Sequence, residues 1–202
     1  MPEPGSIPEF VVFTTRDYAA TGNASLSSAS RRLQRLSGRE TVTRVTKGVW
    51  ANTAHPHFHP LACVPYLLGK EQGYVSFLTA LHLHGVLSQI PRAYQVATTG
   101  RPRVLDSPVG RFEFLRIKPE LMSDGVAWSD TYQPYLIASA EKALLDTLYI
   151  ATRKNRRFAS LPELDLNNGF RRREFERLLL TLPYPVRIRS AMSARWRALC
   201  LQ

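Results

Sequence analysis

Three histidines occupy alternate positions in His55-Pro56-His57-Phe58-His59-Pro60, a residue type and spacing that could bind a metal ion. Alternate side chains of an extended chain point the same way, so the three imidazoles could converge on a metal ion. Zinc sites, however, normally take four ligands from separated segments. The other histidines, His82 and His84, stand two positions apart on an expected helix, which points them away from each other. We therefore expect no metal site here, and the two prolines favour a linker between domains.

Local patterns that support catalysis are absent from the sequence. It contains no glycine-rich phosphate loop, no Gly-x-Ser-x-Gly turn and no paired carboxylates on one expected face. Lys142 and Asp146 have the spacing of an ordinary helical ion pair. We therefore expect a binding protein that is not an enzyme and needs no cofactor. A metal-dependent nuclease, with His55, His57, His59 or Asp146 as ligands, is the remote alternative.

Positive charge is concentrated at the two ends of the chain. The formal net charge is +11, from 27 Lys and Arg against 16 Asp and Glu. Residues 1–50 hold 7 cations and 4 acids, residues 51–150 hold 8 of each, and residues 151–202 hold 12 and 4. Two separated basic segments indicate two surfaces that each meet an acidic partner.

Two short helices are expected before residue 25. Ser6 and Glu9 fit a capping box that opens a helix through Phe10-Val11-Val12. Thr14 and Asp17 repeat that pattern, and the second helix should end at Thr21-Gly22-Asn23. A brief turn containing glycine is typical of helix-turn-helix units.

The third expected helix, from Ser25 or Ser27 to Ser37, has the residue types of a DNA recognition helix. Leu26, Ala29, Leu33 and Leu36 form one apolar stripe, and the opposite face carries serines, Arg31 and Gln34 without any acid. Arg suits guanine edges and Gln suits adenine edges. A solvated helix face is the simpler alternative, but such a face normally intersperses acids among its cations.

A β-branched run at Thr41–Val45, a turn at Thr46–Gly48 and a return at Val49–Ala51 predict a hairpin with a basic tip. Helix, turn, helix and basic hairpin in this order form a winged helix-turn-helix, which we place in residues 1–54. The expected DNA-binding residues are Thr15, Arg16, Ser27, Ser28, Ser30, Arg31, Arg32, Gln34, Arg35, Arg44 and Lys47.

The rest of the chain predicts a linker over residues 55–72 and a mixed α/β domain over residues 73–202. We expect a helix from Phe77 to His84, strands at 94–99 and 111–117 joined by a loop, and a helix that begins at Ser139. An amphipathic helix containing Phe175 to Leu182 follows. The fold class is therefore α+β. A possible second basic surface comprises Arg153, Lys154, Arg156, Arg157, Arg171, Arg172 and Arg173.

No stretch approaches the roughly 20 apolar residues of a membrane span, and Met1–Glu9 lacks the features of a secretory signal. We therefore expect a cytoplasmic protein without a membrane partner. Cys63 and Cys200 are far apart in sequence and are expected to be buried free thiols.

The chain resembles the AbiEi-type antitoxins of bacterial type IV toxin–antitoxin systems. Four passages over roughly residues 10–150 carry the resemblance, and the tail matches only loosely. They are Phe13–Leu36, Arg44–Trp50, the stretch Tyr74-Val75-Ser76 with Thr79-Ala80-Leu81 and His84-Gly85, and Ile137–Asp146.

The resemblance implies an N-terminal domain that represses its own operon at inverted repeats on double-stranded DNA. It also implies a C-terminal domain that counteracts a companion nucleotidyltransferase-like toxin, by direct contact or indirectly. The recognition-helix and hairpin positions carry over from the family, whereas no toxin-facing motif can be matched. A ligand-responsive winged helix regulator without a toxin partner is the alternative.

Overall fold

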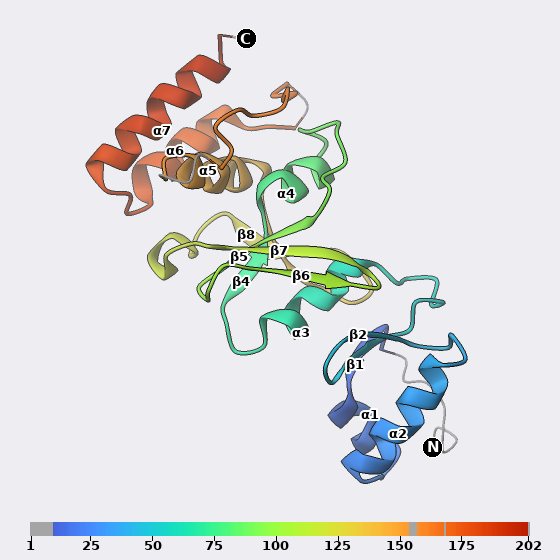
Figure 1. The fold of residues 1–202 in the computed structure, drawn as a ribbon. Helices are drawn as coiled ribbons and strands as arrows, with labels where there is room; N and C mark the ends of the chain where they lie inside the picture. The colour runs from blue at the N-terminus through green and yellow to red at the C-terminus, as the bar shows by residue number, and fades with distance from the viewer. Residues whose placement is uncertain (1–9, 154–156, 168, 202) are drawn as a thin grey trace.

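The N-terminal part of the chain combines two helices with a small antiparallel sheet (Figure 1). The computed structural model describes residues 10–153, 157–167 and 169–201. Strand order in this sheet is β1-β3-β2, so the β2–β3 hairpin pairs with β1 through β3. The elements are β1 (Val12–Thr14), α1 (Thr15–Thr21), α2 (Leu26–Ser37), β2 (Thr43–Thr46) and β3 (Val49–Ala51).

The second and third expected helices are confirmed, and so is the hairpin. Thr14 and Asp17 form the capping box of α1, and Ser25 caps α2 by accepting the N–H of Ser28. The first expected helix is wrong for the part that the structure describes, because Val12 begins strand β1 and pairs with Ala51. Cross-strand pairing here overrides the helical pattern of a short apolar run. Ser6 and Glu9 lie outside the described residues.

A mixed six-stranded sheet with the order β6-β7-β5-β4-β9-β8 forms the centre of the rest of the chain. Strands β5 and β7 are parallel, as are β4 and β9, and the other neighbours are antiparallel. The strands are β4 (Gly73–Val75), β5 (Tyr94–Thr98), β6 (Arg103–Ser107), β7 (Gly110–Arg116), β8 (Val126–Trp128) and β9 (Leu136–Ala138).

Strand β6 corrects the expectation of a plain loop between the strands at 94–99 and 111–117. Its residues pair antiparallel with β7 from Arg103 to Ser107, at the edge of the sheet. An edge strand is half solvated, so its sequence lacks the apolar run that marks β5 and β7. The glycines and prolines around it therefore concealed a strand.

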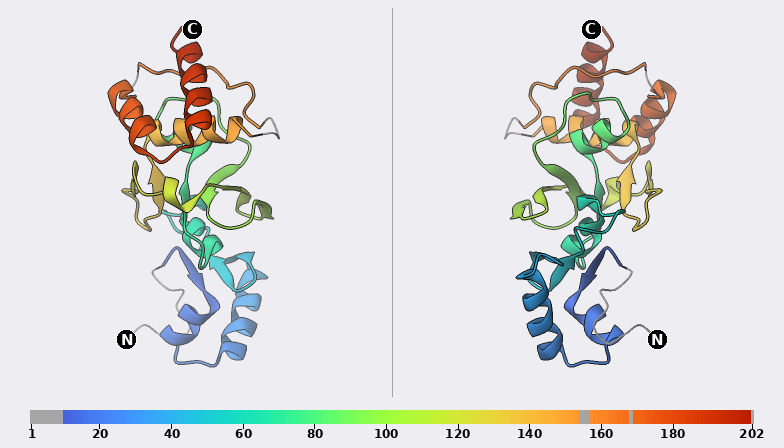
Figure 2. Two further views of the ribbon diagram at one scale, coloured as in Figure 1. Left: turned by 90° about the vertical axis from the view of Figure 1, so that its left-hand side faces the viewer. Right: turned by 90° about the vertical axis from the view of Figure 1, so that its right-hand side faces the viewer.

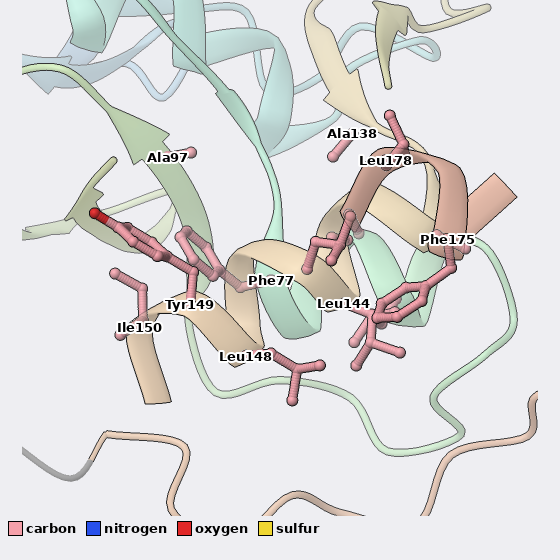
Figure 3. Close-up of a cluster of buried hydrophobic side chains, with 14 of the residues drawn as sticks. Phe77, Ala97, Ala138, Leu144, Leu148, Tyr149, Ile150, Phe175 and Leu178 are labelled. Atoms are coloured by element: carbon pink, nitrogen blue, oxygen red, sulfur yellow. The ribbon is translucent and has the colours of Figure 1, made fainter. Parts of the chain in front are cut away.

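Four helices cover one face of this sheet (Figure 1). All twelve residues of α5 are buried, and Leu144 and Leu148 belong to one hydrophobic cluster with Phe175 and Leu178 of α6 (Figure 3). The predicted helices at 77–84, after Ser139 and around Phe175 are confirmed, whereas the last helix was not predicted. The four are α4 (Phe77–Leu83), α5 (Ala140–Ala151), α6 (Arg172–Thr181) and α7 (Val186–Leu199).

The opposite face of the sheet carries the segment expected to be a linker. Within residues 55–72, a 3₁₀ turn η1 (Pro60–Cys63) and helix α3 (Val64–Leu68) are folded and largely buried. They share one hydrophobic cluster with Val45 and Val49 of the hairpin and with Phe112 and Phe114 of β7. The linker interpretation is therefore wrong for residues 60–68, because these apolar side chains join the small sheet to the large one.

A side chain of the C-terminal part also holds the edge of the small sheet. The amide of Gln133 accepts the N–H of Val12 at 2.8 Å and donates to the carbonyl of Val12 at 2.8 Å. It also donates to the hydroxyl of Tyr66, in α3. This amide satisfies both backbone groups at the free edge of β1, which would otherwise need water or another strand.

Cys63 is buried and Cys200 is exposed, so the expectation of two buried thiols is wrong for Cys200. Burial raises the pKa of Cys63 to about 12. No helix in the described parts of the chain combines the length and the apolar content needed to cross a bilayer.

Candidate nucleic-acid interface

Helix α2 is anchored by a narrow apolar stripe. Ala29 and Leu33 are buried against Phe13, Tyr18 and Trp50, and Leu36 packs partly against the same cluster. Leu26 lies in the first turn and is 53% exposed, so the expectation that it joins the stripe is wrong. The apolar core beneath α2 reaches Ala29 and stops one turn short of Leu26, and the rest of the helix surface stays open.

The open face of α2 presents polar and cationic side chains. Ser28, Arg31, Gln34 and Arg35 line one groove on this face. Arg32 and Arg35 border a second groove together with Arg39. Ser27 is exposed and Ser30 is half-buried. No acid lies on α2, so the face is electropositive over its full length.

Arg39 was not among the expected DNA-binding residues. It lies just beyond Gly38, where α2 ends. Its spacing of four from Arg35 could have identified it, because residues four apart share a helical face and the chain continues for a residue or two past the cap.

Hydroxyl groups organise the first turn of α2. Ser25 Oγ accepts the N–H of Ser28 at 3.2 Å and lies 3.0 Å from the hydroxyls of both Ser27 and Ser28. The first turn of a helix presents unpaired N–H groups and the positive end of the helix dipole. This end of α2 is therefore suited to an anionic oxygen, with Ser27 and Ser28 as additional donors.

Helix α1 holds the hairpin in place beside α2. Thr15 Oγ1 accepts the indole N–H of Trp50 at 2.9 Å, and the N–H of Thr15 donates to the carbonyl of Gly48 at 2.9 Å. Thr15 thus has a structural role whether or not it contacts DNA. Arg16, the next residue, is exposed.

The two hairpin cations that the sequence singles out are both exposed. Arg44 lies over the ring of Trp50 with its guanidinium carbon 5.9 Å from the ring centroid. Lys47 occupies the turn beside Gly48, whose φ of +79° suits glycine. The Trp50 ring restricts the positions open to the Arg44 guanidinium. The Lys47 ammonium projects from the hairpin tip and can reach a phosphate over a wider range of positions.

The possible second basic surface lies at the other end of the molecule from α2 (Figure 2). Arg171 pairs with Glu141, Arg157 pairs with Glu113, and Arg153 lies over the ring of Tyr149. Arg172 and Arg173 are exposed on α6. Lys154 and Arg156 lie outside the described residues. Three of the expected cations therefore already contact groups within the fold.

The ion pair between Arg171 and Glu141 strongly lowers the pKa of the Glu141 carboxyl. Burial favours a raised pKa, but hydrogen bonds from the side chain and backbone of Arg171 outweigh it and lower the pKa of Glu141 to about 2. Glu141 is buried at the start of α5, so this pair fixes the chain that enters α6.

The histidine segment does not converge on a point. His59 Nδ1 accepts the N–H of Leu61 and caps η1, and burial lowers the pKa of His59. His57 instead stacks on Tyr132 with ring centroids 4.9 Å apart, and the ring of His55 is tilted against Tyr132 at 5.2 Å. Across the described ranges, no three side chains of His, Cys, Asp or Glu are grouped as metal ligands.

Lys142 and Asp146 form an ion pair as expected, but the pair is buried. The ammonium contacts Asp146 and donates to the hydroxyl of Tyr74 at 2.8 Å. Tyr74 and Ser76 both donate to the second carboxylate oxygen, at 2.9 and 2.8 Å. Burial and the Asp146 charge raise the pKa of Tyr74 well above its ordinary value, which keeps this donor protonated.

Comparison with models of known protein families and with curated proteins gives no match to this chain.

Proposed function

We propose that this protein is a sequence-specific regulator that binds double-stranded DNA through α2 and the β2–β3 hairpin. In this proposal α1 and α2 are a helix-turn-helix, and the hairpin is its wing. One observation carries the proposal. Ala29 and Leu33 are buried while the opposite face of α2 is open, cationic and free of acids, next to a hairpin with a basic tip. Such a regulator acts in the cytoplasm and needs no cofactor or catalytic group.

The roles of the side chains follow from their reach. Arg31 and Gln34 line the middle of the open face, where a groove-bound helix meets base edges, so they read sequence. Arg35 and Lys47 lie to either side and contact phosphates, which position the protein without reading sequence. The first turn of α2 supports this role, because its N–H groups and hydroxyls favour a phosphate.

The test measures binding to DNA from upstream of the protein's own gene and to a scrambled duplex, over a range of salt concentrations. R31A/Q34A should bring the two affinities close together, whereas K47A should weaken both alike and reduce the salt dependence. Arg173→Ala, at the far end of the molecule, is the charge-matched control for K47A and should change neither. Unchanged preference for the upstream duplex in R31A/Q34A would refute the recognition-helix assignment.

A second proposal is that the regulator is an antitoxin that represses its own operon and counteracts a companion nucleotidyltransferase-like toxin. It rests on the resemblance to AbiEi-type antitoxins. One observation favours it, because Tyr74 and Ser76 from one shared passage contact Lys142 and Asp146 from another. Those passages therefore describe one buried centre and not unrelated short matches.

Co-expression with the neighbouring gene, scored for rescue of growth, tests the antitoxin proposal. Rescue by R31A/Q34A would indicate that neutralisation does not require operator binding. A neighbour that is not toxic when expressed alone would contradict the proposal and favour the ligand-responsive regulator. That alternative is supported by a recess between the α4–β5 connection, residues 163–167, the start of α6 and the end of α7. Its lining includes Ser88, Asp165, Arg172 and Cys200.

A further inference from the structure

Four cations from three separate segments gather at one end of the large sheet. One follows α3, one follows β5, one is the last residue of β7 and one lies just beyond that strand, and each is exposed. We call the group the sheet-end patch, and its members are Lys70, Arg101, Arg116 and Lys118.

Strand pairing explains why these segments meet. Strand β4 begins where β5 ends, because the two are antiparallel and Gly73 pairs with Thr98. Strand β7 ends beside β5, because the two are parallel and Thr98 pairs with Arg116. Hydrogen bonds continue this pairing past the strand ends, from Thr99 N–H to the Gln72 carbonyl and from Ile117 N–H to the Thr98 carbonyl. All four cations thus project from one corner of the fold.

The acid nearest to this corner is already neutralised. Glu71 accepts hydrogen bonds from Arg103 at 2.7 Å and from Thr98 at 2.8 Å. Burial favours a raised pKa for Glu71, but these hydrogen bonds outweigh it and lower the pKa. No member of the sheet-end patch takes part in an ion pair among the residues that the structure describes. The exposed Glu120 lies close to Lys118 in sequence, so the corner keeps a clear excess of positive charge.

The sheet-end patch lies on the side of the sheet that faces the DNA-binding module. Arg116 lies two residues after Phe114 and four after Phe112, so it shares a face of β7 with these rings. Both rings pack into the buried cluster that also holds Val45 and Val49. Those two valines flank the hairpin tip that carries Lys47. Lys70 follows α3, which lies between the large sheet and the hairpin (Figure 1). The exposed arginines of α6 and α7 lie beyond the opposite face of the sheet.

We propose that the sheet-end patch is a second DNA-binding site, which contacts backbone phosphates beyond those reached by the helix-turn-helix. This inference rests on the proposed function. Unpaired Lys and Arg side chains without a neighbouring base-reading element fit phosphates and not base edges. The patch therefore lengthens the bound stretch of DNA on the hairpin side and adds affinity without adding sequence preference.

The test compares the full-length protein with the variant K70A/R101A/R116A/K118A on an upstream duplex trimmed to the recognised bases and on one extended at both ends. On the extended duplex, the slope of log affinity against log salt should become shallower by roughly 0.9 for each lost phosphate contact. Hydroxyl-radical protection should shorten on one flank only. On the trimmed duplex the variant should match the wild type.

The matched control is R172A/R173A/R187A/R197A, which removes the same charge at the opposite end of the molecule. It should leave the salt slope and the protected length unchanged, and circular dichroism should show that both variants are folded. A wild-type footprint and slope in the sheet-end variant would overturn the inference while leaving the proposed function intact. Equal losses in both variants would also overturn it, because they would reflect net charge. Failure of the wild type to bind any upstream duplex would instead reject the proposed function.

Discussion

Replacing Asp146 should destabilise the protein far more than replacing a similar residue at the surface. The carboxylate of Asp146 accepts from the Lys142 ammonium and from the hydroxyls of Tyr74 and Ser76, and all four residues are buried. Asp146→Ala leaves the ammonium without a counter-ion and the two hydroxyls without their acceptor. None of these groups can reach water without opening the contact between α5 and β4.

The expected magnitude follows from that burial. Removing one partner of a buried ion pair costs about 3–5 kcal/mol, and each unsatisfied buried hydroxyl adds about 1–3 kcal/mol. The total is a large fraction of the roughly 5–15 kcal/mol that stabilises a typical domain. Asp146→Asn is the milder variant, because it retains an acceptor oxygen and the side-chain volume while still leaving Lys142 uncompensated. We expect it to lose at least about 3 kcal/mol.

Urea unfolding followed by circular dichroism measures both variants. The control is Arg177→Ala, which breaks an exposed pair with Glu174 and Asp124 and should lower the unfolding free energy far less, because solvent screens exposed charges. If Asp146→Asn and Arg177→Ala lower the unfolding free energy equally, burial does not increase the contribution of the Asp146 network to stability. The reasoning for this centre of the fold would then be wrong.

Three further predictions concern acid stability, thiol access and backbone strain. A carboxyl whose pKa falls from 4.5 to about 2 on folding stabilises the protein above pH 4.5 and loses that contribution as the pH falls toward 2. The unfolding free energy should therefore drop more in the wild type than in Glu141→Gln over that window, and parallel acid curves would contradict this. Ellman's reagent should modify Cys200 in the folded protein and Cys63 only after denaturation, whereas fast modification of both would show that Cys63 is accessible. Gly125 has a φ of +77°, and an added Cβ would lie 2.8 Å from Cβ of Lys142. Thermal melts should therefore show that Gly125→Ala is destabilised by about 1–3 kcal/mol. An unchanged melting temperature would show that glycine is not required at this position.

Elements with a strong local signal were predictable from the sequence. Thr14 with Asp17 marks the start of α1, and Ser25 and Gly38 mark the two ends of α2, because capping depends on neighbours within a few residues. Helix α5 was recognisable from Ser139 for the same reason. Strand β6 and helix α7 were missed, since an edge strand and a helix with a weakly segregated face show little periodicity.

The candidate interface was predictable only in part. Arg31 and Gln34 could be assigned from helical spacing, because their exposure follows from the burial of Ala29 and Leu33 on the same helix. Sequence spacing did not show that Thr15 bonds Trp50, or that Leu26 lies beyond the underlying core. Both depend on where the hairpin lies relative to the helices, which is a long-range property.

By itself the sequence determined where helices α1, α2, α5 and α6 form and which face of α2 is cationic. These features depend on residues a few positions apart, so local rules suffice to predict them. Only the tertiary structure decided that Lys142 and Asp146 are buried and that residues 60–68 join two sheets instead of linking two domains. It also brought Lys70, Arg101, Arg116 and Lys118 to one corner. Burial and the meeting of distant segments depend on strand order and on what packs over each face, and no short stretch of sequence contains that information.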